Sequence, residues 1–151
     1  MTHTFNTPIG AVRLVEEDGS IIRIELTDAA APSSAPTPLL SEVEHQITVF
    51  LRGERRQLDF PIRMVGTPFQ QRVWQALQQI PYGATRTYGA IATAIGTPRA
   101  SRAVGMACNK NPLLLIVPCH RVVGANGKLV GFSYGTEAKH QLLELESHGI
   151  L

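Results

Sequence analysis

The side chains best suited to chemistry in this chain lie around one cysteine in its C-terminal third. Cys119 and His120 directly follow a continuous apolar run, residues 113–117, which Pro118 ends. Such a run predicts a buried strand, which would deliver the cysteine thiol to a rigid turn. A neighbouring histidine and basic residues such as Arg121 favour the thiolate, the nucleophilic form of cysteine. The pattern therefore predicts that Cys119 is a nucleophile.

The same residues also allow a purely structural interpretation. Free cysteine is commonly a small buried hydrophobe, so a histidine beside a cysteine is weak evidence of catalysis. Adjacent side chains of a strand point to opposite faces. We therefore expect His120 to act on Cys119 through a water molecule, and to need an acid that orients it. The acids downstream of the pair are Glu137, Glu144 and Glu146.

The elements that must hold these residues begin with a small α/β unit. Residues 5–26 contain two stretches of alternating β-branched residues around an EEDGS turn, which predicts a hairpin. Apolar residues at helical spacing predict an amphipathic helix over 39–51, ending at Gly53. The Ala/Pro/Ser-rich residues 29–38 predict a surface connection. A Thr-Pro start signal and a second apolar stripe predict another helix over 67–80.

Two further short helices are predicted over residues 87–96 and 98–109, with Gly96 at the corner between them. The second helix carries Arg99 and Arg102 among small residues, which let a helix approach DNA closely. Two helices joined by a short glycine-containing turn are typical of a helix-turn-helix. Such pairs also occur as hairpins that only pack, and spacing alone does not separate the two interpretations.

The distribution of charge favours the DNA-binding interpretation. The net charge is only +2, but residues 1–65 hold six Arg and nine Asp or Glu, whereas residues 66–151 hold eight Lys or Arg and three Asp or Glu. No acidic residue lies between Asp59 and Glu137. The C-terminal half can therefore face a polyanion. The basic residues of that window are Arg63, Arg72, Arg86, Arg99, Arg102, Lys110, Arg121 and Lys128.

Length and composition exclude several classes of protein. A chain of 151 residues with 44% hydrophobic and 17% charged residues forms one ordinary domain or two small ones, and is not disordered. No apolar run reaches the roughly 20 residues of a membrane-spanning helix, and the N-terminus lacks a signal-peptide pattern. Cys108 and Cys119, without a CxxC motif or grouped histidines, argue against a disulfide framework and a metal site. We therefore expect a cytoplasmic protein with reduced thiols.

A longer string around Cys119 resembles a known signature. Residues 118–124, PCHRVVG, are similar to the active-site signature (I/V)PCHRV(I/V)G of the O6-alkylguanine-DNA alkyltransferases, the methylated-DNA–protein-cysteine methyltransferases of direct DNA repair. The resemblance runs in family order from GTPFQQRVWQALQQIPYGATRTYGAIA through RAVGMACNKNP to GFSYGTEAKHQLLELE, and covers residues 66–146. The first 60 residues are similar only in general character.

The resemblance implies a single irreversible reaction at Cys119. In this family the cysteine attacks the alkyl carbon on guanine O6 in an SN2-like displacement and keeps the group as a thioether. By position, His120 would hold a water that relays the thiol proton to Glu146, and Asn111 would order the turn. Tyr88 would donate a proton toward guanine N3 as the base leaves. Neither a metal nor an organic cofactor is expected.

The resemblance also implies how DNA is held. A base inside a duplex is out of reach of a buried thiol, so it must be flipped out, and Arg102 would enter through the minor groove to fill the gap. The expected partner is double-stranded DNA containing O6-alkylguanine, with O4-alkylthymine as a further candidate. The protein itself would be a monomer in isolation, without a membrane partner. The implied DNA-binding residues are Arg102, Tyr88, Thr87, Ser101 and Arg121, and those of the substrate pocket are Ser133, Phe132, Tyr134, Val122 and, near the rim, Lys139.

Two features depart from the family pattern. Where the family usually has a Tyr-Ser-Gly-Gly loop, residues 132–135 read Phe-Ser-Tyr-Gly, which removes one hydroxyl and adds a large ring. We expect Tyr134 to narrow the pocket and to slow reaction with bulky O6-benzyl groups. The alternatives are a ring turned to solvent or stacked on DNA. The second thiol, Cys108, has no activating neighbour in sequence and is expected to be inert.

The resemblance implies an α+β fold in two parts. Residues 1–62 would form a small α/β, RNase H-like domain, and residues 66–151 a winged helix-turn-helix-like domain that binds DNA and accepts the alkyl group.

Two other classes of protein use similar residues. Alkyltransferase-like proteins bind lesions with tryptophan in place of the reactive cysteine, so Cys119 argues against that class. A Cys-His hydrolase would turn over repeatedly and has no reason for an acid-free basic region.

Overall fold

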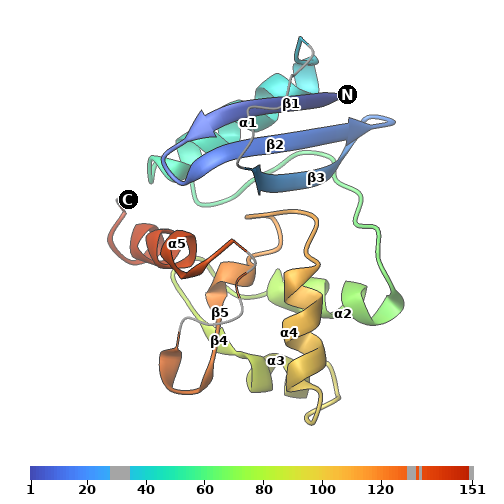
Figure 1. The fold of residues 1–151 in the computed structure, drawn as a ribbon, viewed down its shortest axis with the longest axis vertical. Helices are drawn as coiled ribbons and strands as arrows, with labels where there is room; N and C mark the ends of the chain where they lie inside the picture. The colour runs from blue at the N-terminus through green and yellow to red at the C-terminus, as the bar shows by residue number, and fades with distance from the viewer. Residues whose placement is uncertain (28–34, 129–131, 133, 150–151) are drawn as a thin grey trace.

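The N-terminal part of the computed structural model is a three-stranded antiparallel sheet, in the order β1–β2–β3, with one helix against it (Figure 1). The structure describes residues 1–27, 35–128, 132 and 134–149, so most of the predicted connection over 29–38 lies outside the described residues. The predicted hairpin and helix are confirmed, and β1 is an additional strand. The elements are β1 (Thr2–Thr7), β2 (Gly10–Glu17), β3 (Ser20–Thr27) and α1 (Pro38–Leu51).

Local sequence accounts for these elements. Asp18 and Gly19, between β2 and β3, have φ angles of 51° and 78°, which a tight two-residue hairpin turn requires. Thr37 caps α1, because its hydroxyl accepts a hydrogen bond from the Leu40 backbone N–H (3.1 Å). Buried side chains from the sheet and the helix form one apolar layer: Val12, Leu14, Ile21, Ile24, Leu40, Val43, Ile47 and Phe50.

The C-terminal part is mainly helical (Figure 1). The Trp74 indole N–H donates to the Ala107 carbonyl (2.9 Å), so a buried hydrogen bond joins the first helix of this part to the third. Two short strands, Arg86–Thr87 and Val122–Val123, pair in parallel, with Arg86 opposite Val122. The elements are α2 (Pro68–Leu77), β4 (Arg86–Thr87), α3 (Tyr88–Ala94), α4 (Ser101–Asn109), the 3-10 turn η1 (Cys119–Arg121), β5 (Val122–Val123), the 3-10 turn η2 (Ala125–Gly127) and α5 (Thr136–His148).

The predicted strand over 113–117 is wrong, although the run is buried. The Val117 N–H donates to the Leu113 carbonyl (2.9 Å), and Leu115 has a φ of 73°, so the chain turns back on itself. Leu113 pairs with Ile24 of β3 only as an isolated bridge. An apolar run predicts that its side chains are buried, but not which backbone conformation buries them. A turn packed against the edge of a sheet can bury them as well as a strand does.

The second helix of the predicted pair, over 98–109, starts later in the structure than the sequence predicts. The Ala100 N–H donates to the Thr97 carbonyl (2.9 Å), so Thr97 and Pro98 belong to a turn and α4 begins at Ser101. Arg99 therefore lies outside α4. Arg102 lies on the first turn of the helix.

The two parts of the molecule meet at the outer edge of β3. The backbone of Ile21 is hydrogen-bonded to residues 61–63, and that of Ile24 to residues 112–114, with N···O distances of 2.8–3.0 Å. The buried side chains of both parts belong to one continuous hydrophobic core. Within the described ranges, no helix has the length and apolar character needed to cross a membrane.

Candidate active site

Cys119 begins η1, at the end of a buried turn that Asn111 holds. The Asn111 side-chain amide donates to the Val117 carbonyl (2.8 Å), and its side-chain carbonyl accepts from the Leu113 N–H (2.8 Å). The Cys119 N–H donates to the same Val117 carbonyl (2.8 Å). Asn111 therefore lies where a residue that orders this turn must lie.

The Cys119 thiol is buried, with 5% of the residue exposed, and its Sγ donates to the Cys108 carbonyl (3.5 Å). Burial, and then the Cys108 thiol, raise the pKa of Cys119 well above its ordinary value. The Asn111 side chain and the Lys139 ammonium act in the opposite direction, with smaller effects. The expectation that basic surroundings favour the thiolate is therefore wrong for the protein without DNA, because burial and the second thiol outweigh the basic groups.

His120 is fully buried, and its Nε2 lies 2.7 Å from Oε2 of Glu146. Burial lowers the pKa of His120, against the opposing effect of Glu146. Burial alone would raise the pKa of Glu146, but hydrogen bonds from His120 and Arg121 hold it at about 2. A neutral imidazole beside an ionised carboxylate donates from Nε2, which makes Nδ1 an acceptor. Nδ1 has no hydrogen-bond partner among the described residues, so it is the base that this site offers.

Arg121 is buried and belongs to the same network. Its Nε and Nη2 donate to the two carboxylate oxygens of Glu146 (2.7 and 2.8 Å), and its Nη1 donates to the Ile80 carbonyl (2.8 Å). The Gly83 N–H adds a longer hydrogen bond to Glu146 (3.3 Å). The expected DNA-binding role of Arg121 conflicts with this placement, because its guanidinium is held by a buried carboxylate and a backbone carbonyl.

Lys139 is fully buried, which corrects the expectation that it lies near the pocket rim. Its ammonium donates to the Val122 carbonyl, and its Nζ lies 5.8 Å from the Tyr88 ring centroid and 5.9 Å from that of Phe132. Burial lowers the pKa of Lys139, while the two cysteine thiols raise it. The ammonium therefore forms part of the wall around the reactive sulfur.

Tyr88 starts α3, directly after Thr87. The Thr87 hydroxyl caps the helix by accepting from the Ala90 N–H (3.0 Å). Burial, followed by the thiols of Cys108 and Cys119, raises the pKa of Tyr88 to about 12. Its hydroxyl therefore stays protonated at neutral pH and can serve as a donor.

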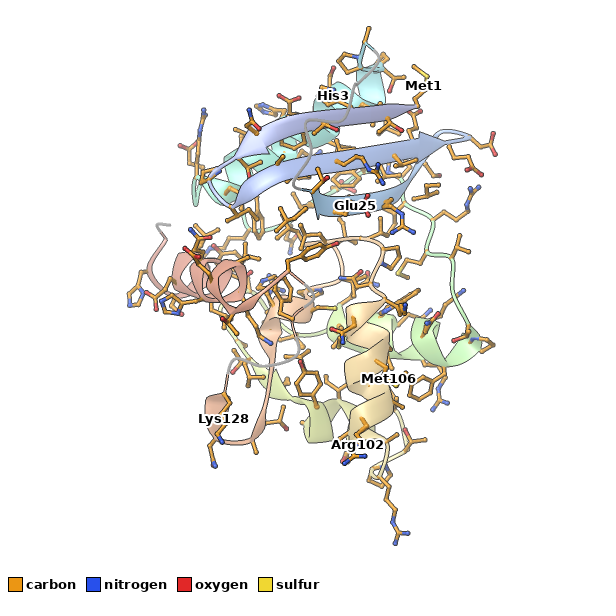
Figure 2. All side chains as sticks on the ribbon, viewed as in Figure 1. Met1, His3, Glu25, Arg102, Met106 and Lys128 are labelled. Atoms are coloured by element: carbon orange, nitrogen blue, oxygen red, sulfur yellow. The ribbon has the colours of Figure 1, made fainter. Side chains whose placement is uncertain are left out.

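The outer face of α4 carries exposed side chains at both ends of the helix. Arg102 lies at the N-terminal end of the helix and Met106 lies further along it, and both side chains are exposed (Figure 2). Ser101, next to Arg102, is half-buried. Met106 is 68% exposed and was not singled out from sequence, since apolar spacing marks buried faces rather than exposed ones. Gly105 of the same helix faces Tyr88, because a Cβ added there would lie 3.9 Å from the tyrosine ring.

The predicted pocket loop is described in part, and Ser133 lies outside the described residues. The rings of Phe132 and Tyr134 meet edge to face, with centroids 5.6 Å apart. Tyr134 is half-buried and contacts the backbone of Leu26 in β3. It lines a cavity of about 520 Å³ between the β1–β2 turn and the start of α5. The Tyr134 ring is therefore packed between the two parts of the chain rather than turned to solvent.

Known proteins share both the sequence and the fold. The DNA-binding domain of the 6-O-methylguanine DNA methyltransferase family matches residues 68–148. A methylated-DNA–protein-cysteine methyltransferase of Methanosarcina acetivorans is 43% identical in an alignment of 148 positions that covers 94% of this chain and 95% of the relative. The constitutive enzyme of that name from Bacillus subtilis is 42% identical over 95% of this chain and 93% of its own. The crystal structure of Mycobacterium tuberculosis OGT in complex with DNA is 42% identical, has a TM-score of 0.89, and covers 99% of this chain and 94% of that chain.

Proposed function

Because the chain belongs to the 6-O-methylguanine DNA methyltransferase family, we propose that it repairs alkylated DNA directly, by moving the alkyl group from guanine O6 to Cys119. The observation that carries the proposal is the buried pair of His120 and Glu146 beside this cysteine, in which the ionised carboxylate leaves Nδ1 of His120 as a base. The thioether product is not cleaved again, so each molecule acts once. O4-alkylthymine in DNA is a further candidate substrate.

The thiol must lose its proton before or as it attacks, since the thiolate is the nucleophile. Nδ1 of His120 takes this proton, through the water molecule that the family resemblance implies. Glu146, whose pKa is about 2, remains ionised and stabilises the imidazolium instead of accepting the proton itself. Arg121 supports that step as a positioning residue, because it fixes the Glu146 carboxylate through two hydrogen bonds.

The displacement forms one bond and breaks one. The Cys119 sulfur attacks the alkyl carbon, the bond from that carbon to O6 breaks, and the electron pair stays on the guanine. The Tyr88 hydroxyl donates toward guanine N3, where negative charge develops, and its pKa of about 12 keeps the hydroxyl protonated until then. The Lys139 ammonium, held by the Val122 carbonyl, adds a positive charge near the departing base.

DNA is bound from the minor groove through α4, with the damaged nucleotide flipped into the pocket. Support comes from Arg102, which is exposed at the start of the helix, and from its small half-buried neighbours Ser101 and Ala103, which allow close approach. Thr87 and Ser101 flank this face. Phe132, Tyr134 and Val122 line the pocket, with Ser133 assigned to it by the family resemblance alone.

The finer description of the fold belongs to the same proposal. Residues 1–62 form an RNase H-like α/β domain and residues 66–151 a winged helix-turn-helix-like domain, in a protein that acts as a monomer. Support for the first comes from the three-stranded sheet with α1. Support for the second comes from α3 and α4, which pack together and are joined by a turn that contains Gly96, with its φ of 81°.

Intact-mass spectrometry after incubation with a duplex containing O6-methylguanine tests the proposed reaction. We expect a gain of one CH2 unit per protein molecule, located on the tryptic peptide 111–121 that contains Cys119. The Cys119→Ser variant should gain nothing and should still bind the duplex. An unmodified wild-type protein, or one that releases methyl groups to solvent over many turnovers, would contradict the proposal.

A further inference from the structure

The second cysteine of the chain lies beside the first. Cys108, in the last turn of α4, and Cys119 are both buried, with 4% and 5% of each residue exposed. Sγ of Cys119 donates to the Cys108 carbonyl (3.5 Å), and the Cys108 thiol is near enough to raise the pKa of Cys119. Tyr88 and Lys139 lie within the electrostatic reach of both. The alkyl transfer uses one of these sulfur atoms and gives the other no role.

We propose that Cys108 is a resolving thiol for Cys119: when the protein without DNA meets hydrogen peroxide, the two sulfur atoms close an intramolecular disulfide that reversibly blocks the alkyl acceptor. The sequence offers no neighbour that would activate Cys108, but the fold places the Cys119 sulfur beside it as a reaction partner. The disulfide itself depends only on the two cysteines, whereas its consequence for repair rests on the proposed function.

The reaction proceeds in two balanced steps. The Cys119 sulfur attacks one peroxide oxygen, the O–O bond breaks, and the products are a sulfenic acid on Cys119 and one water, which carries away the thiol proton. The Cys108 sulfur then attacks the Cys119 sulfur, the S–O bond breaks, and the hydroxyl leaves as a second water with the Cys108 proton. Each sulfur is oxidised by one electron, and the peroxide is reduced by two.

The surroundings decide which sulfur reacts first. The Asn111 amide and the Lys139 ammonium lower the pKa of Cys119 in part, although burial and Cys108 outweigh them, and Cys119 is the sulfur that the alkylated base must reach. A peroxide molecule is much smaller than that base, so the same approach admits it. The sulfenic acid then forms against the Cys108 thiol rather than against bulk water, which favours disulfide closure over further oxidation.

Both cysteines lie at ends of their elements, where closure needs little movement. Cys119 begins the three-residue turn η1, and Cys108 is the last residue but one of α4. The Cys108 carbonyl lies 3.5 Å from Sγ of Cys119, so the backbone of Cys108 is directly beside the reactive sulfur before any movement.

Peptide mapping of the full chain tests this inference without DNA. The reduced protein is exposed to hydrogen peroxide, alkylated with N-ethylmaleimide in denaturant and digested with trypsin. We expect a disulfide between peptides 103–110 and 111–121, each of which contains one cysteine, and an intact protein lighter by two hydrogen atoms. Alkyl acceptance measured before digestion should fall by roughly tenfold or more and return after dithiothreitol treatment.

The matched controls are Cys108→Ser and Cys108→Ala, each checked for folding by thermal unfolding. In both variants we expect Cys119 to proceed to sulfinic acid, with a loss of alkyl acceptance that dithiothreitol does not reverse. A wild-type protein that gives the same sulfinic acid, with Cys108 labelled by N-ethylmaleimide, or that forms disulfides only between molecules, would overturn the inference. A disulfide in a protein that accepts no methyl group when reduced would instead contradict the proposed function alone.

Discussion

Among single residues, Glu146 makes the free energy of unfolding depend on pH. Its carboxylate accepts hydrogen bonds from His120 and Arg121, which hold its pKa at about 2 against an ordinary 4.5. A carboxyl group whose pKa is lower in the folded than in the unfolded protein stabilises the fold at pH values above the unfolded pKa. This contribution is lost as the pH falls through the folded pKa. The shift corresponds to about 3 kcal/mol at neutral pH.

We therefore expect Glu146→Gln to lower the free energy of unfolding by about that much at pH 7. The difference between variant and wild type should shrink between about pH 4.5 and pH 2, because protonation then neutralises the wild-type carboxylate as well. Urea unfolding of both proteins at several pH values measures this difference in the free energy of unfolding. Glu144→Gln, on the exposed side of the same helix, is the control and should change stability little; a Glu146 effect that persists unchanged at pH 2 would contradict the argument.

We also expect a single residue, Tyr134, to set which alkyl groups the substrate pocket accepts. Its ring packs edge to face on Phe132 and against β3, so the ring is held in place near the pocket. We expect the wild-type protein to react more slowly with O6-benzylguanine than with O6-methylguanine in DNA. Tyr134→Ala should raise the benzyl rate by roughly tenfold and change the methyl rate by less than about threefold, since removing the ring leaves an open cavity.

Single-turnover rates with the two lesions in one duplex sequence measure this ratio. Phe132→Tyr is the matched control, because it restores the hydroxyl common in the family without changing the bulk of the ring. The control should leave the ratio close to that of the wild type. Equal or faster benzyl transfer by the wild-type protein would show that Tyr134 does not narrow the pocket.

The sequence identifies the side chains of this site better than it predicts their charges. Cys119 stands out from its neighbours, but burial and the Cys108 thiol of α4 keep its thiol protonated, and no local pattern reveals either effect. Arg121 follows the cysteine directly and resembles a DNA contact, because its partner Glu146 lies 25 residues further on. Lys139 could have been placed, since Lys139, Leu142 and Glu146 share one helix face by spacing.

At the scale of elements, α4 carries the proposed contact with DNA. We expect Arg102→Ala to slow repair of O6-methylguanine in a duplex by roughly 10- to 100-fold, because the guanidinium would offset a few kcal/mol of base extrusion. The rate with the free modified base should stay within about twofold, since no base has to be extruded. Arg99→Ala is the matched control: it removes an equal charge from the exposed turn before the helix. Equal losses with duplex and free base would contradict the extrusion role of Arg102.

Helix boundaries follow from the sequence where a capping residue fixes them. Thr67, Pro68 and Gln70 form a capping box with proline in the first turn, and α2 begins where this pattern predicts. The Thr97-Pro98 pair has the same residue types, but its turn closes early and α4 starts at an uncapped position. The turn over 113–117 escaped prediction, because its backbone is held by Asn111 and by Ile24 of β3, which no local pattern reveals.

For the whole molecule, β3 links the folding of the two parts. Its inner edge pairs with β2, and its outer edge is hydrogen-bonded to residues 61–63 and 112–114 of the following chain. Ile24 is fully buried at this junction, and its backbone makes two of the hydrogen bonds that cross it. A hydrophobic core shared in this way favours a single cooperative unfolding transition over two independent ones.

The chain has one tryptophan, Trp74, which lies in α2 of the C-terminal part and reports on that part alone. We expect Ile24→Ala, a change in the N-terminal sheet, to destabilise the protein by roughly 2–5 kcal/mol and to shift the Trp74 fluorescence transition in urea as far as the transition in far-ultraviolet circular dichroism. Arg23→Ala, an exposed change on the same strand, should shift neither by more than about 0.5 kcal/mol. If the Trp74 transition stays in place while the dichroism signal splits in two, residues 1–62 unfold independently of residues 66–151. The edge of β3 would then not couple the sheet to the helices that hold the reactive cysteine.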